Sequence, residues 1–198
     1  MSHTVFEKSK WIWVASGECP DQYVEFCERI SYRGGEVTVR LSCDGDYTLF
    51  VNGRYVASNQ YGDFEHYKIY DTLSLAPYLT EEENELLFLV HHVGASTFRY
   101  RPAAAGLLYE ILAKDTPIAY SSEKTKSRQA PTYACGRQVF VSRQLGFTFF
   151  YDATQEGAGE AFAPSQAVAK NCTLSPLIIL IPPHILVLWS FLTHTSVL

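Results

Sequence analysis

The chain has 198 residues, a formal net charge of −5 and 47% apolar residues, with 13 Tyr and 12 Phe among them. This length suits one large domain, and β-sandwiches often fill it as a single unit. The apolar content is sufficient for a packed core and excludes disorder for most of the chain. The acidic balance and scattered Lys and Arg residues offer no basic field for phosphates, so we expect no nucleic-acid partner.

Cysteine spacing and the first residues indicate the compartment. The chain has five cysteines without C-x-x-C spacing: Cys19, Cys27, Cys43, Cys135 and Cys172. This pattern favours neither a zinc cage nor a full disulfide framework, so we expect buried free thiols in a reducing compartment. The opening MSHTVFEKSKWIW does not contain the apolar stretch of a secretory signal. We therefore expect a cytoplasmic location.

The first half of the chain predicts paired strands. Val37, Val39 and Leu41 alternate with polar residues, which is the two-residue period of a half-buried strand. A turn cluster at 43–46 follows, and residues 47–51 are rich in β-branched and aromatic side chains. Asn52-Gly53 then separates this strand from the next at 54–57. Because both central residues of a type I′ turn need positive φ, Asn52 and Gly53 predict a tight hairpin turn.

Further short strands are predicted along the rest of the chain. They cover 68–75, 85–93, 107–112, 118–120, 138–141 and 146–151. The continuous apolar run at 85–93 favours a strand buried on both faces, and 107–112 should pair with 118–120 through a turn at 115–117. No window shows helical periodicity with caps. The sequence therefore predicts an all-β fold, an antiparallel β-sandwich or jelly roll.

The C-terminal segment differs from the rest in composition. Residues 174–198 are strongly apolar, but Pro176 and Pro182-Pro183 divide them into pieces shorter than the roughly 20 residues of a membrane span. We predict a sandwich domain at 1–173, with 174–198 as final strands or a truncated edge. A membrane anchor is a third, less favoured interpretation of this segment, and we expect no membrane partner.

Several stretches resemble, in the same order, the N-terminal sandwich region of bacterial α-L-rhamnosidases. Residues 47–56 (YTLFVNGRYV) are similar to the hairpin of galactose-binding-like domains in bacterial glycoside hydrolases. The other matching stretches are Lys10-Trp11-Ile12-Trp13, Tyr70-Asp71-Thr72-Leu73, Tyr78-Leu79, Asn84-Glu85-Leu86, Ala105-Gly106-Leu107-Leu108, Gly146-Phe147, Tyr151-Asp152-Ala153 and Pro182-Pro183-His184-Ile185. The chain departs from the family pattern at Glu83, Lys124 and Pro183. The resemblance implies a galactose-binding-domain-like β-sandwich, whereas hydrolysis in that family belongs to a later α/α barrel.

Candidate catalytic groups are few. Asp44 and Asp46 lie two residues apart, as do Asp63 and Glu65, but a glycosidase needs two carboxyl groups held at a defined separation, and loop acids in water are the simpler interpretation. His91 and His92 are adjacent on a predicted strand, so their side chains should point to opposite faces and not share one metal ion. We therefore predict no catalytic residue, no metal site and no cofactor, while a structural calcium in a loop stays open.

Sugar recognition is the chemistry that the loops favour most. Flat rings cover the apolar face of a pyranose while amides and carboxylates bond its hydroxyls. Two aromatic and polar loops supply the candidate carbohydrate-binding residues Asn59, Tyr61, Asp63, His66, Tyr67, Phe98 and Tyr100. The alternative is that these rings cover the sandwich or pack against a neighbouring domain, and Asn52 and Gly53 serve the turn alone.

The resemblance gives the first functional hypothesis. The chain would be a non-catalytic N-terminal sandwich, a fragment or accessory domain of a bacterial α-L-rhamnosidase-like glycoside hydrolase. It would position the catalytic barrel or border its carbohydrate cleft. The alternative is an autonomous carbohydrate-binding module. The expected partners are accordingly an adjacent catalytic domain or a rhamnose-containing glycan.

Overall fold

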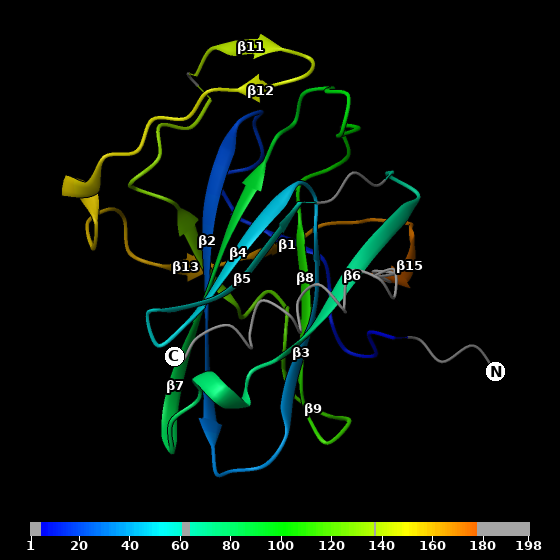
Figure 1. The fold of residues 1–198 in the computed structure, drawn as a ribbon, viewed down its shortest axis with the longest axis vertical. Helices are drawn as coiled ribbons and strands as arrows, with labels where there is room; N and C mark the ends of the chain where they lie inside the picture. Colours follow the sequence, from blue (N-terminus) through cyan, green and yellow to red (C-terminus); the bar gives the residue numbers. More distant parts are fainter. Residues whose placement is uncertain (1–4, 61–63, 137, 178–198) are drawn as a thin grey trace, which may run out of the picture.

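The computed structural model describes residues 5–60, 64–136 and 138–177, and these are built almost wholly of strands (Figure 1). The elements in chain order are β1 (Ile12–Trp13), β2 (Gln22–Tyr32), β3 (Val37–Cys43), β4 (Asp46–Val51), β5 (Arg54–Gln60), β6 (Tyr67–Ser74), the 3₁₀ turn η1 (Ala76–Tyr78), β7 (Glu82–His92), β8 (Leu107–Ala113), β9 (Thr116–Tyr120), β10 (Lys126–Gln129), β11 (Phe140–Ser142), β12 (Gly146–Phe147), the 3₁₀ turn η2 (Ala153–Gln155), β13 (Ala163–Pro164), β14 (Gln166–Ala167) and β15 (Thr173–Pro176).

Two sheets hold most of these strands. The first sheet has the order β14-β1-β8-β3-β6-β15, with β9 also paired to β8, and the second has the order β13-β10-β2-β7-β4-β5. Neighbouring strands are antiparallel, except that β15 runs parallel to β6. The predicted all-β sandwich is therefore confirmed, with one parallel pair that the sequence pattern did not indicate.

Strand alternation places the core between the two sheets. In β4 and β7 every second residue is fully buried, including Leu49, Phe88 and Val90, while the residues between them face outward. The first sheet contributes a matching buried row from β3 and β8. Phe88 stacks on Tyr109 across the gap with ring centroids 4.6 Å apart, so the two sheets are joined by direct ring contact.

The Asn52-Gly53 turn is confirmed. Asn52 has φ 51° and Gly53 has φ 73°, so both central residues lie in the left-handed region that a type I′ turn requires. The Asn52 side chain also accepts a hydrogen bond from the Glu85 backbone N–H at 3.0 Å. The turn residue thus also ties the hairpin to the first part of β7.

Two predicted strand features differ from the structure. The run at 85–93 is not buried on both faces, because Leu87 and Leu89 are only half-buried on the outer side of the second sheet. The turn after β8 is made by Lys114 and Asp115, both with positive φ, so 116–117 already belong to β9. The burial of the outer strand face depends on tertiary packing, and the position of the turn depends on the backbone conformation of its residues. Local composition shows neither.

The segments 138–141 and 146–151 do not join the sandwich. They form the separate two-stranded sheet β11–β12, which stands apart at one end of the molecule (Figure 1). We call residues 138–151 the apolar arm. The connection from 130 to 162 that contains this arm runs along the outer face of the second sheet, where Tyr133 packs on Tyr23.

The C-terminal segment is described only up to Leu177. Strand β15 pairs with β6 and so crosses the predicted boundary at 173–174, while residues 178–198 lie outside the described part of the chain. Within the described part, no helix has the length and apolar character needed to cross a membrane.

Candidate functional site

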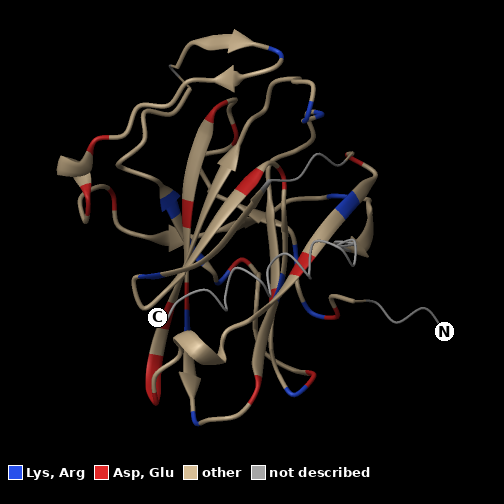
Figure 2. Ribbon diagram, viewed as in Figure 1, with Lys and Arg blue, Asp and Glu red and all other residues tan. Residues whose placement is uncertain are grey.

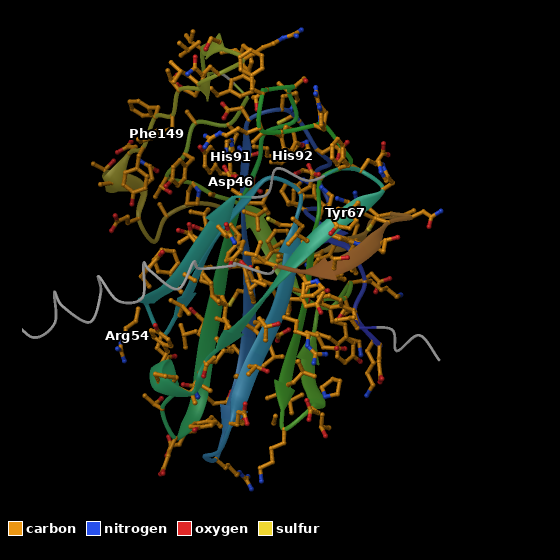
Figure 3. The ribbon with its side chains drawn as sticks, turned by 45° about the vertical axis from the view of Figure 1, so that its right-hand side comes forward. Asp46, Arg54, Tyr67, His91, His92 and Phe149 are labelled. Atoms are coloured by element: carbon orange, nitrogen blue, oxygen red, sulfur yellow. The ribbon has the colours of Figure 1, made fainter. Side chains whose placement is uncertain are left out.

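The second sheet brings chemically active side chains together at the end where β2 and β4 begin and β7 ends. His91 lies directly opposite Asp46 on one side and Tyr23 on the other in the strand register. All three side chains lie on the outer face, since they alternate with the buried positions of their strands. Figure 3 shows Asp46 and His91 close together at this end.

His91 lies between two carboxylates. Its Nε2 is 3.2 Å from Oδ1 of Asp21, and its Nδ1 is 3.6 Å from Oδ2 of Asp46. Burial opposes the charge on this ring, but the hydrogen bonds and charges of Asp21 and Asp46 outweigh it and raise the pKa of His91 above its ordinary value. The imidazolium form therefore persists to higher pH than in an exposed histidine.

Ring stacking fixes the orientation of His91. Tyr23 stacks on its ring with centroids 4.1 Å apart and nearly parallel planes, and Tyr133 stacks on the other side of Tyr23 at the same 4.1 Å. A cation over an aromatic face is an attractive contact. The stack thus holds both the histidine and the connection around residue 133 against the sheet.

A pocket of about 220 Å³ opens beside His91, and we call it the loop-end pocket. Its lining includes a carboxylate, a guanidinium, an amide and three aromatic rings. The lining residues are Tyr23, Asp46, His91, Val93, Thr97, Arg99, Tyr100, Gln144, Leu145, Gly146 and Phe147. This mixture of hydrogen-bonding groups and ring surface is the kind that recognises a sugar hydroxyl pair and its apolar face.

A second set of charges is buried around Asp44, and we call it the interior charge cluster. Lys68 Nζ is 2.8 Å from Asp44 Oδ1, with both side chains at most 1% exposed. His92 Nδ1 lies 3.0 Å from Asp44 Oδ2, and the hydroxyl of Tyr100 donates to the same oxygen. Lys170 Nζ is 4.0 Å from Asp44 Oδ1. Asp44 therefore balances the cations of this interior.

The cluster shifts the ionisation of its members. Burial opposes the charge on Asp44, but its contacts with His92, Lys170 and Lys68 outweigh burial and lower the pKa of its carboxyl. Lys170 is less well compensated: burial lowers the pKa of its amine to about 8, against the opposing attraction of Asp44. Its Nζ makes no hydrogen bond to the described residues and lies 4.3 Å from the centroid of the Trp11 ring.

Gly45 lies between Asp44 of the interior charge cluster and Asp46 of the loop-end pocket. It has φ 102°, and a Cβ built on it would lie 2.2 Å from the backbone oxygen of His91. Only glycine fits this position, because other residues would meet the backbone of β7 in an unfavourable conformation. The turn at Gly45 sends Asp44 inward and Asp46 outward, so these two carboxylates do not form an acid–base pair.

The two histidines also face opposite sides, as predicted: His91 lines the loop-end pocket and His92 bonds Asp44 in the interior. Among the described residues, no group of three or more His, Cys, Asp or Glu side chains is arranged to hold a metal ion. Whether a loop binds calcium stays a prediction.

The predicted carbohydrate-binding residues do not gather in one place. Asn59 donates to Oδ2 of Asp71 at 2.9 Å, and the exposed ring of His66 stacks on Phe64. Tyr67 is exposed at the start of β6 (Figure 3), and Phe98 is exposed too. Tyr100 lines the loop-end pocket, whereas Tyr61 and Asp63 lie outside the described residues. Their role in sugar binding stays a prediction.

The apolar arm is the second prominent surface. It carries a single described charge, Arg143, and Figure 2 shows most of it without charged residues. Large apolar side chains at least half exposed are Val139, Val141, Leu145, Phe149 and Phe150, and Phe98 lies beside them through a 2.8 Å bond from its N–H to the carbonyl oxygen of Arg143. Contiguous apolar surface of this kind marks interaction sites.

All five cysteines are free thiols. The prediction that they are buried is wrong for most of them: Cys43 is buried, Cys19 is exposed, and Cys27, Cys135 and Cys172 are intermediate. Cys27 is on the outward side of β2, where it alternates with the buried Phe26, and Cys135 and Cys172 lie in connecting segments.

Comparison with known proteins identifies the architecture. No family model and no curated protein matches the chain. Among solved structures, the family 78 rhamnosidase of Bacillus sp. GL1 matches 86% of this chain with 21% identity and a TM-score of 0.73. The α-L-rhamnosidase from Dictyoglumus thermophilum matches 86% with 15% identity and a TM-score of 0.62. The lectin from Pleurotus ostreatus, in a complex with GalNAc, matches 82% with 18% identity and a TM-score of 0.53.

The chain spans about a fifth of the two rhamnosidases, 20% and 22%, and 42% of the lectin. At these identities the likeness is one of fold. The predicted resemblance to a sandwich region of α-L-rhamnosidases is thus confirmed: the chain has a β-sandwich of the kind found in these glycoside hydrolases and in a sugar-binding lectin.

Proposed function

We propose that this chain is a non-catalytic β-sandwich module of a larger α-L-rhamnosidase-like glycoside hydrolase, which docks against the neighbouring catalytic domain through the apolar arm. The observation that carries the proposal is the exposure of the arm. Leu145 is 69% exposed and Phe149 is 71% exposed, on a hairpin that projects from the sandwich. Covering apolar surface contributes about 25 cal/mol per Å², so a cluster of such side chains is a strong basis for association.

The fold comparison supports the choice of partner. This sandwich aligns with about a fifth of each rhamnosidase, so the aligned sandwich in those enzymes is part of a longer chain. The loop-end pocket opens beside the arm and shares Leu145 and Gly146 with it. A domain docked on the arm would therefore border this pocket, which fits a role at the edge of a carbohydrate cleft.

A chimera tests the docking role. This chain replaces the aligned sandwich in the Bacillus sp. GL1 enzyme, and melting temperature and hydrolysis of an aryl α-L-rhamnoside are measured. We expect Leu145→Asp with Phe149→Asp to lower both values in the chimera. Ile118→Asp, at a 44% exposed residue of β9, is the control and should change neither. An unchanged chimera with both arm substitutions would refute docking through the arm.

The isolated chain provides an independent measurement. It should bind an apolar fluorescent dye in its native state through the exposed arm, and the double arm variant should bind much less. It should also release no rhamnose from the aryl rhamnoside. Hydrolysis by the isolated chain would overturn the non-catalytic role, whatever the chimera does.

The loop-end pocket favours a second candidate function, an autonomous carbohydrate-binding module. In that case the isolated chain binds L-rhamnose or a rhamnose-containing oligosaccharide in titration calorimetry. Asp46→Ala and Arg99→Ala should each weaken the binding, because both side chains line the pocket. Tyr120→Ala, at an exposed ring of β9 outside the pocket lining, is the matched control. Absence of heat with every sugar would remove this candidate.

A further inference from the structure

A second pocket lies on the outer face of the same sheet, next to the aromatic stack, and we call it the sheet-face groove. Its volume is about 410 Å³, within the range of small-ligand sites. The floor is formed by Phe50 of β4 with Leu87 and Leu89 of β7, which alternate with core residues and point outward. These three side chains are half-buried, so the connection from 130 to 162 borders the floor without covering it.

One wall of the groove is aromatic. Tyr133 and Tyr151 line it, with ring centroids 5.1 Å apart in an edge-on arrangement. Tyr133 is fixed by its stack on Tyr23, whereas Tyr151 is 42% exposed. The ring of Tyr151 is therefore accessible to a ligand, and the fixed ring of Tyr133 packs against it.

A buried arginine holds the rest of this wall in place. Arg128 Nε is 2.7 Å from Oε2 of Glu25, with side chains 15% and 12% exposed. Its guanidinium also donates to the carbonyl oxygens of Ala158 and Glu160 and lies 4.4 Å from the centroid of Phe162. A site whose walls are fixed before binding loses less entropy when a ligand enters.

Two of the three carboxylates that line the groove are paired with arginines. Glu25 pairs with Arg128, and Glu85 pairs at 3.0 Å with Arg29, which lies outside the lining. The third carboxylate, that of Glu156, accepts a hydrogen bond at Oε1 from the hydroxyl of Tyr151 at 2.6 Å. The carboxylates at the rim keep further acceptor positions for hydroxyl groups, while the two ion pairs compensate part of the negative charge.

From this combination we infer that the sheet-face groove binds an uncharged oligosaccharide, separately from the loop-end pocket. The apolar C–H face of a pyranose would rest on Leu87, Leu89 and the Tyr151 ring, and its hydroxyls would donate to the Glu85 and Glu156 carboxylates. A purely apolar ligand would leave the remaining acceptor positions of those carboxylates without hydrogen bonds, which is costly. The inference does not depend on docking through the apolar arm.

Titration calorimetry on the whole chain tests the inference. The probes are cellotetraose, mannotetraose and a rhamnose trisaccharide, all neutral, with a chitosan tetramer as the cationic comparison. We expect at least one neutral probe to bind, and Tyr151→Ala to weaken it at least tenfold. Phe149→Ala removes an exposed ring two residues away that does not line the groove, so its dissociation constant should stay within twofold.

Two further measurements show where the probe binds. The bound probe should shift the amide resonances of Leu87 and Leu89 more than those of Arg99 and Gln144, and Asp46→Ala in the loop-end pocket should leave the affinity unchanged. No binding by any neutral probe, tighter binding of the chitosan tetramer, or equal loss in Phe149→Ala would each overturn the inference. None of these results bears on the chimera, so the two proposals fail separately.

Discussion

Two carboxylate–histidine pairs, formed by Asp44 and Asp46 on one segment and His92 and His91 on another, have opposite surroundings. Asp44 and His92 are buried with Lys68, whereas Asp46 and His91 face outward at the loop-end pocket. The same chemical groups therefore serve the interior in one case and a solvent-facing site in the other. The difference shows that side-chain direction, more than residue type, decides what an ionisable pair does in a sandwich.

The energetic expectations for the two pairs also differ. Removing one partner of a buried ion pair leaves a charge without compensation and costs several kcal/mol. An ion pair in contact with water is screened and contributes about 1 kcal/mol or less. The comparison is therefore testable by substitution at the inner and outer positions.

The largest effect is expected at Asp44. Asp44→Ala removes the group that compensates Lys68, which is 1% exposed, so we expect a loss of ~3–5 kcal/mol in the free energy of unfolding. Urea unfolding at neutral pH measures it. Asp46→Ala is the matched control, with an expected loss of about 1 kcal/mol or less. Equal losses in the two variants would show that the inner and outer pairs do not differ.

The second-largest effect is expected at Lys170, where substitution should stabilise the protein and not destabilise it. Lys170→Met should stabilise the protein at pH 7 by about 2 kcal/mol, because burial makes the charged amine unfavourable in the folded state. As the pH rises from about 8, the folded protein loses this proton while the unfolded chain keeps it up to about 10.4. The wild type then gains stability relative to the variant.

Urea unfolding of both proteins at pH 7 and pH 10 checks this expectation. The advantage of Lys170→Met should shrink by about 1.4 kcal/mol per pH unit through that window. An advantage that is the same at both pH values would mean that the amine has an ordinary environment.

The smallest effect is expected at His91. Its pKa is raised in the folded state, so its charge stabilises the fold fully below the unfolded pKa of about 6.5, and this contribution is lost as the pH rises through the higher folded-state value. His91→Gln should therefore cost about 1 kcal/mol at pH 5.5 and less at alkaline pH. His66→Gln, at an exposed ring, is the control; a similar pH dependence there would contradict the assignment to the Asp21–His91–Asp46 contacts.

Much of the fold could be predicted from the sequence, because residue alternation and turn residues indicate strands and hairpins locally. Alternation marked β3 and β6, and Asn52-Gly53 marked the β4–β5 turn. Strand β2 was missed. Val24 and Phe26 are buried there and alternate with half-buried residues, but the apolar and aromatic residues of this strand do not form a continuous run. The separation of β11–β12 from the sandwich depends on tertiary packing that composition does not show.

The candidate site was less accessible to sequence reasoning. Asp46, His91 and Arg99 meet only because β4 pairs with β7 and the following loop folds back, and no motif links positions so far apart. The opposite directions of His91 and His92 followed from strand geometry and were predicted. The role of Lys170 could not be anticipated, because its partner Asp44 is 126 positions away in the sequence.

Gly45 has a consequence for the design of variants. A side chain there would overlap the His91 carbonyl oxygen, so position 45 admits only a hydrogen atom. A library that randomises 44–46 and is selected for folding should return glycine at its centre almost without exception, while 46 varies freely and 44 stays acidic. One missing methyl group thus keeps the ionic interior and the outward-facing rim of the loop-end pocket on different sides of a single turn.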